Sequence, residues 1–160
     1  MERYVAVVGP GDAATDEECR LAEQVGVLLA GAAATVVTGG LGGVMAAAAR
    51  GAQRTGGRTV GLLPGLDRSA AAASNSVTIP TGLGQLRNGV LVNSCDGVIA
   101  VGCSWGTLSE IALARRVGKP VVALRGWTIL DQQGKPEPLD AAELPEEAVT
   151  RLLDQLPRLT

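Results

Sequence analysis

The chain contains few side chains of the types that usually perform catalysis. The chain contains no histidine, which excludes Ser-His-Asp and Cys-His catalysis. Lys119 and Lys135 are the only lysines, and each precedes a proline, at a strand entry and in a polar loop, where a Schiff base is not expected. Carboxylates, arginine and backbone dipoles are therefore the groups left for chemistry.

Glycines recur directly after the apolar runs that are typical of strands. In an open parallel sheet these turns meet at one edge, where ligands bind near the point at which strand order reverses. Glycine lets the backbone approach an anion closely, and turns that feed helices add the positive end of a helix dipole. Glycine is also common in ordinary strand-to-helix turns, but clusters in several loops favour a phosphate-binding site. The candidate binding residues are Gly9, Gly11, Gly39, Gly40, Gly43, Gly102, Ser104, Gly106 and Thr107.

The elements that must position these residues alternate between short β-branched runs and Ala/Leu-rich helical stretches. This alternation predicts one doubly wound α/β domain over residues 1–160, with a parallel sheet covered on both faces. The expected strands are 4–8, 35–38, 59–63, 77–79, 97–101 and 120–124. The expected helices are 16–30, 44–53, 86–94, 108–117 and 145–156, and residues 125–144 are expected to form a surface loop.

Glu110 has two interpretations that the sequence leaves open. Thr107 and Glu110 fit a capping box, in which the hydroxyl and the carboxylate satisfy each other's backbone donors. Alternatively, a carboxylate in the first turn of a helix lies at the mouth of the cleft, where it could stabilise a sugar cation or orient water.

The composition limits the partners of the chain. The net charge is −2 without a basic stripe, so no nucleic acid is expected, and no apolar run is long enough to cross a membrane. Cys19, Cys95 and Cys103 lack a C-x-x-C spacing, so we expect no metal site, no disulfide and no cofactor. A cytoplasmic location follows as the default. The helix expected at 86–94 is apolar on more than one face, which predicts a homo-oligomer.

The segment Gly106-Thr107-x-x-Glu110 resembles half of the PGGxGTxxE signature of the Lonely Guy family, phosphoribohydrolases often labelled lysine decarboxylases. Gly39-Gly40 and Gly43-Val44-Met45 are similar to the family's glycine turn, and Arg87 matches its arginine at the family's spacing. The similarity spans about residues 4–124. It implies that Arg87 and Glu110 are catalytic and that the 102–107 loop holds a 5′-phosphate.

Three departures point to a short branch that also resembles the molybdenum cofactor carrier proteins. Gly102-Cys103-Ser104 replaces Pro-Gly-Gly, Asn88 replaces a lysine, and Gly9-Pro10-Gly11-Asp12 replaces Gly-Ser-Ser. The carriers hold a pterin phosphate and perform no hydrolysis.

Our leading hypothesis from the sequence is a nucleoside 5′-monophosphate phosphoribohydrolase that breaks an N-glycosidic bond. The alternative is a non-catalytic carrier or sensor of a phosphorylated small molecule, and a silent oligomer with a vestigial site is a third possibility. Trp105 either stacks on the ligand or packs at an interface.

Overall fold

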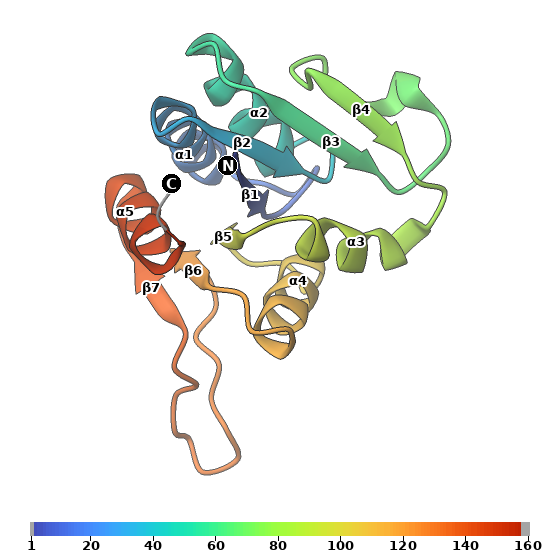
Figure 1. Cartoon of the computed structure of the whole chain (residues 1–160). Coiled ribbons are helices and arrows are strands. Elements are labelled where there is room, and N and C mark those ends of the chain that lie inside the picture. The colour runs from blue at the N-terminus through green and yellow to red at the C-terminus, as the bar shows by residue number, and fades with distance from the viewer. Residues whose placement is uncertain (1, 158–160) are drawn as a thin grey trace.

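The computed structural model describes residues 2–157 and contains one seven-stranded sheet in the order β4-β3-β2-β1-β5-β6-β7 (Figure 1). Neighbouring strands pair in parallel throughout. The strands are Arg3–Val8 (β1), Ala34–Thr38 (β2), Thr59–Leu63 (β3), Val77–Pro80 (β4), Gly97–Val101 (β5), Val121–Leu124 (β6) and Asp140–Ala142 (β7).

Helices cover both faces of this sheet because its central strands are apolar on both sides. In β1, Val5 and Val7 pack into one core, whereas Ala6 and Val8 pack into the other. The first core contains residues from α1 (Asp16–Gly31), α2 (Val44–Arg54) and α5 (Pro145–Gln155), and the second contains residues from α3 (Arg87–Asn93) and α4 (Trp105–Arg116). The predicted doubly wound α/β fold is confirmed. The single domain over 1–160 stays a prediction, and residues 1 and 158–160 lie outside the described range.

The prediction that residues 125–144 form only a surface loop is wrong. Asp140–Ala142 forms β7, which pairs with β6, and Leu130 and Pro136 form an antiparallel bridge within the segment that projects from the sheet in Figure 1. The Asp-Ala-Ala sequence of β7 has neither β-branched residues nor an apolar run, so it gave no strand signal. Strand β7 forms because it pairs with β6, although its own residues have little intrinsic β-propensity.

The start predicted for the fourth helix at residue 108 is also wrong. Helix α4 begins at Trp105, because Ser104 is its N-cap and its side chain accepts a hydrogen bond from the Thr107 amide. Upstream, a 3₁₀ turn at Gly84–Leu86 leads into α3, which begins at Arg87. Helix α1 begins as predicted at Asp16, after the N-cap Thr15, and Glu18 completes a capping box with Thr15.

The topology fixes where a ligand site can form. Strand β1 lies between β2 and β5, and the chain leaves β1 toward α1 on one face but leaves β5 toward α4 on the other. The two loops therefore diverge at the carboxyl ends of adjacent strands, which opens a crevice between them. The glycine turns after β1, β2 and β5 all lie at this edge.

Lys119 stabilises the far end of the helix that carries Arg87. Its ammonium group donates hydrogen bonds to the carbonyl oxygens of Val92 at 2.9 Å and Asn93 at 2.7 Å, and also to that of Cys95. Val92 and Asn93 are the last two residues of α3, so the positive charge also stabilises the negative end of the helix dipole.

Replacing Lys119 with methionine is therefore expected to lower the free energy of unfolding by about 1–3 kcal/mol, the scale of hydrogen bonds made by a charged group. Urea denaturation followed by circular dichroism measures the change. Lys135→Met is the matched control, because Lys135 is exposed on the projecting segment and its side chain makes no hydrogen bond within residues 2–157. An equal effect of the two substitutions would contradict this role.

Candidate functional site

The turns after β1 and β2 interlock. The Val44 amide donates to the Pro10 carbonyl at 3.0 Å, and Gly43 has a φ of 61°. A Cβ on Gly43 would overlap the Gly11 carbonyl oxygen and lie 2.5 Å from that of Pro10. Glycine is therefore required at position 43 both for its backbone conformation and for its contact with the first turn.

The third turn, after β5, leads into α4. Ser104 accepts from the Thr107 amide at 3.1 Å, and the two hydroxyls lie 2.7 Å apart. The capping-box interpretation of Thr107 and Glu110 is wrong, because Ser104 is the N-cap of α4. The reciprocal position three residues later is Thr107, and Glu110 lies a further three residues along the helix. Glu110 is therefore free of any capping role.

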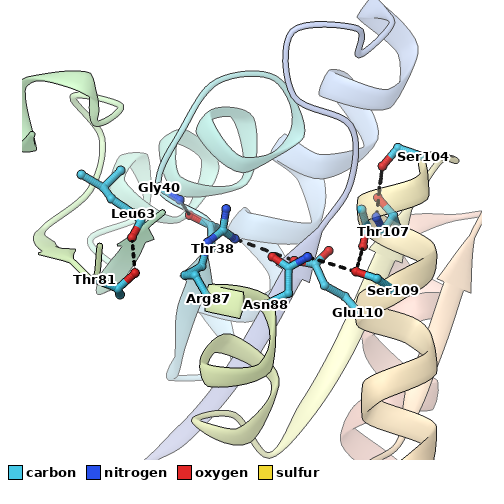
Figure 2. Close-up of polar contacts among 11 residues, drawn as sticks. Thr38, Gly40, Leu63, Thr81, Arg87, Asn88, Ser104, Thr107, Ser109 and Glu110 are labelled. Carbon is cyan, nitrogen blue, oxygen red and sulfur yellow. Dashed lines mark hydrogen bonds and ion pairs between the residues drawn. The ribbon is translucent and has the colours of Figure 1, made fainter. Parts of the chain in front are cut away.

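Arg87 and Glu110 lie together in the interior, although neither is a core residue by type (Figure 2). Arg87 is 8% exposed and Glu110 is 6% exposed, and Arg87 Nη1 lies 3.8 Å from Glu110 Oε1. The first turn of α3 supplies the arginine, and the second turn of α4 supplies the glutamate. The pair links the two helices at the carboxyl edge of the sheet.

The glycine turn after β2 makes room for the arginine. A Cβ on Gly39 would overlap Arg87 Nη1 and lie 2.9 Å from Arg87 Cζ and 2.6 Å from Met45 Sδ. The guanidinium thus lies against bare backbone, and its Nε has no hydrogen-bond partner within residues 2–157 although it is buried. A buried charged donor without an acceptor is costly, so this atom marks a place where an anion would be stabilised.

Burial dominates the electrostatics of the pair. It raises the pKa of Glu110 to about 7, against the opposing effect of the Arg87 charge. Burial also lowers the pKa of Arg87, against the opposing effect of Glu110. A carboxyl group with a pKa near neutrality can hold or release a proton under ordinary conditions, which suits either proton transfer or an adjustable partner for the arginine.

Cys103 is a poor nucleophile despite its exposed position in the third turn. Partial burial raises the pKa of its thiol, and the nearby Glu18 carboxylate raises it further. The same carboxylate lies against Gly102. Because the thiolate is the reactive form, Cys103 is not suited to covalent catalysis.

The structure thus brings most of the predicted site residues to one edge of the sheet. Gly9 packs against the Val101 carbonyl, so the first turn also adjoins the end of β5. Gly40 differs from the other glycines of the site because its backbone polar groups are already hydrogen-bonded within the protein. Its amide donates to Thr38 Oγ1, and its carbonyl accepts from the Ala72 amide and from Asn75 Nδ2. Its polar backbone groups therefore tie the second turn to neighbouring segments.

Two contributions escaped the sequence analysis. Asn88 is buried and donates to Ser109 Oγ at 3.0 Å, so it links α3 to α4 one residue from the ion pair (Figure 2). Trp127, which follows β6, donates from Nε1 to the Ser104 carbonyl at 3.3 Å. In the sequence analysis, Asn88 was noted only as a replacement of the family's lysine, and Trp127 was expected in a loop.

Two further findings concern the part of the chain that the structure covers. Residues 2–157 contain no cluster of three or more His, Cys, Asp or Glu side chains that could hold a metal ion. Across the same residues, no helix has the length and apolar character needed to span a membrane.

Comparison with known proteins identifies the family. The model of the SLOG cluster4 family (LDcluster4) matches residues 2–149, and the chain belongs to this family. The SLOG superfamily includes Lonely Guy-like proteins, which confirms the resemblance at that broader level. An uncharacterized protein of Archaeoglobus fulgidus is 38% identical over 145 residues, or 91% of either chain.

Solved structures show the same fold over nearly the whole chain. The molybdenum cofactor binding protein of Rippkaea orientalis has a TM-score of 0.87 and 34% identity, covering 96% of this chain and 97% of that one. The molybdenum cofactor carrier protein of Chlamydomonas reinhardtii has a TM-score of 0.82 and 29% identity, covering 97% and 100%. DNA processing protein A of Streptococcus pneumoniae shares the fold alone, with a TM-score of 0.73 and 22% identity over 99% of this chain and 63% of that one.

The interlocked turns predict a sharp contrast between two glycines. Gly43→Ala should destabilise the protein by several kcal/mol, because a Cβ there meets backbone on the first turn and the positive φ is unfavourable. Gly31→Ala should be neutral or stabilising by up to about 1 kcal/mol, since Gly31 lies in α1 and its Cβ would meet nothing within 4 Å. Thermal melting of both variants measures the contrast, and similar melting temperatures would contradict the interlock.

The raised pKa of Glu110 predicts a pH dependence of stability. The unfolded carboxyl group ionises near its model value of 4.5, whereas the folded group keeps its proton until about pH 7. Its contribution to stability is therefore full below pH 4.5 and is lost as the pH rises to 7 and above. Relative to wild type, Glu110→Gln should become more stable across this window, by up to roughly 3 kcal/mol.

Urea unfolding at a series of pH values from 4.5 to 8 measures this difference. Glu137→Gln is the control, because Glu137 is exposed on the projecting segment, and its curve should follow that of wild type. The stability of Glu110→Gln relative to wild type could instead fall as the pH rises. The attraction of Arg87 for an ionised Glu110 would then outweigh the cost of burying the charge, contrary to this account.

Proposed function

We propose that this protein binds a phosphorylated pterin of the molybdenum cofactor type and carries it without hydrolysis. The observation that carries the proposal is the buried Arg87 guanidinium, with its unpartnered Nε, at an edge formed by three glycine turns. The likeness to the molybdenum cofactor proteins of Rippkaea orientalis and Chlamydomonas reinhardtii over almost the full chain supports it.

The phosphate would be held by two kinds of donor. The first-turn amides of Trp105 and Gly106 have no acceptor within residues 2–157, and the positive end of the α4 dipole favours an anion there. Arg87 supplies a full positive charge from α3. Gly39 lets the backbone of the second turn lie directly against the Arg87 guanidinium, and Gly43 lets this turn pack on the first one, so the glycine turns hold the cation at the edge of the sheet.

Carriage is favoured over hydrolysis by the state of Glu110 and by the third turn. A carboxylate that stabilises a sugar cation must be ionised, whereas burial raises the pKa of Glu110 to about 7 and keeps much of it neutral at physiological pH. Cys103 and Ser104 also place side chains where the Lonely Guy signature has glycines. In a carrier, Glu110 instead lies beside the arginine when no ligand is bound.

The second candidate is the phosphoribohydrolase, and the pairing of Arg87 with Glu110 is the observation in its favour. A carboxyl group with a pKa near 7 could donate a proton to the leaving base or activate a water molecule. Arg87 would then hold the phosphoribosyl group in place. This reaction cleaves the N-glycosidic bond and releases the base and ribose 5-phosphate.

The other expectations remain proposals of the same account. The patch formed by the exposed residues Leu86 and Val90 is suited to a contact between copies, whereas Leu91 and Val92 of the same helix are buried within the chain. We also propose a homo-oligomer, a cytoplasmic location and no binding of nucleic acid. These three properties are equally compatible with a carrier and with a hydrolase.

Arg87→Ala is expected to lose at least tenfold in affinity for neopterin monophosphate, because it removes the buried cation that the phosphate contacts. Isothermal titration calorimetry measures the affinity, and thermal melting of the free variant checks its fold. Arg116→Ala is the matched control, since Arg116 is exposed at the opposite end of α4. Equal affinities for the two variants would contradict the phosphate site.

Glu110→Gln separates the two functions. The carrier should keep or improve its affinity for neopterin monophosphate, because the neutral amide no longer competes for Arg87, and wild type should release no base from nucleoside monophosphates. If wild type does release a base, and Glu110→Gln slows that release by ~10²-fold, the scale of a lost preorganised electrostatic group, the hydrolase replaces the carrier.

A further inference from the structure

We propose that the groove between α3 and α4 binds the planar heterocyclic ring of the same phosphorylated ligand, with Trp105 as the stacking surface. This inference rests on the proposed function and adds the part of the site that reads the ring. The groove has a volume of about 600 Å³, and its lining includes Gln85, Leu86, Asn88, Trp105, Gly106 and Ser109.

Trp105 is an unusual residue for a solvent-facing position. It is 80% exposed, yet its indole lies 5.7 Å from that of Trp127, with the two planes inclined by 40°. Trp127 is itself fixed by its hydrogen bond to the Ser104 carbonyl. One side of the Trp105 ring is therefore supported by a second aromatic residue, which prepares the ring for stacking at little entropic cost.

The groove is continuous with the phosphate site. Trp105 and Gly106 are the first two residues of α4, directly after the Ser104 cap, so one helix turn borders both the groove and the phosphate donors. On the facing helix, Leu86 and Asn88 flank Arg87 in the sequence. A ligand with its phosphate at Arg87 and the amino end of α4 thus has the groove beside it.

Charge complementarity indicates which part of the ligand lies in each place. The side chains that line the groove are all uncharged. Arg87, the cation that pairs with Glu110, lies outside this lining. A neutral ring suits the groove, and the charged phosphate suits the arginine. A ligand without a phosphate would leave the phosphate donors unused.

The polar edge of the groove favours a ring with donors and acceptors. Asn88 donates through Nδ2 to Ser109, which in turn donates to the Gly106 carbonyl at 2.6 Å, so the Asn88 amide is fixed in one orientation. Its Oδ1 accepts no hydrogen bond from residues 2–157, and the exposed Gln85 amide lies in the same lining. Apolar walls at Trp105 and Leu86 with amide groups between them match a pterin or a purine.

Titration of wild type and Trp105 variants with two probes tests the proposal. Trp105→Ala should weaken neopterin monophosphate about 5- to 150-fold, the range of lost stacking on an aromatic side chain, while inorganic phosphate changes less than twofold. Trp105→Phe should recover most of the affinity. Leu130→Ala is the control, because it removes an exposed apolar side chain of the projecting segment that does not line the groove, and it should behave as wild type. GMP in place of neopterin monophosphate shows whether the groove prefers a purine.

Three outcomes would overturn the inference while leaving the proposed function intact. Neopterin monophosphate could bind Trp105→Ala as tightly as wild type, or both probes could weaken equally, which would make Trp105 a support for the loop only. Light scattering could also show that Trp105→Ala dissociates an oligomer with ligand affinity unchanged, which would make a second copy the occupant. If wild type bound neither probe, the proposed function itself would fail together with this inference.

Discussion

The burial of Arg87 against Glu110 is the constraint on which the site depends. Two ionisable side chains, 8% and 6% exposed, face each other across α3 and α4 at a separation of 3.8 Å. Burying such a pair costs solvation free energy that the ion pair recovers only in part, and pairs of this kind are weak contributors to stability. Its presence in an aliphatic domain is therefore better explained by ligand binding than by folding.

The fold makes this burial possible by supplying backbone where side chains would otherwise stand. The Gly39 turn leaves space for the guanidinium, and Gly43 lets the first two turns interlock below the cleft. Lys119 holds the carboxyl end of the helix that begins at Arg87. The aliphatic sheet with two helical layers is thus a rigid support for one charged pair and three glycine turns.

The sequence was sufficient for the fold because the central strands are continuous apolar runs separated by helices and glycine turns. It missed β7, since Asp140–Ala142 is defined by its pairing with β6 and carries no strand signal of its own. It also misplaced the start of α4, because Ser104 and Thr107 are equally good capping residues by type and only the backbone decides between them.

The site could be predicted only in part for a related reason. Gly39 was recognisable from the glycine cluster that follows a strand, Glu110 from its place near a helix start, and Arg87 only from the family resemblance, but their mutual contact depends on the packing of α3 on α4. Asn88 and Trp127 act through bonds to Ser109 and Ser104, which are distant in the sequence. The pKa of Glu110 likewise follows from burial, which no local pattern encodes.

A crystal structure with neopterin monophosphate is the most direct measurement of the central claim, that the buried arginine and the amino end of α4 form one phosphate site. The account predicts intact ligand, with its phosphate in contact with both Arg87 and the first turn of α4 and with Glu110 no longer the nearest anion to the guanidinium. A phosphate bound elsewhere, with the Arg87–Glu110 pair closed as it is here, would contradict it.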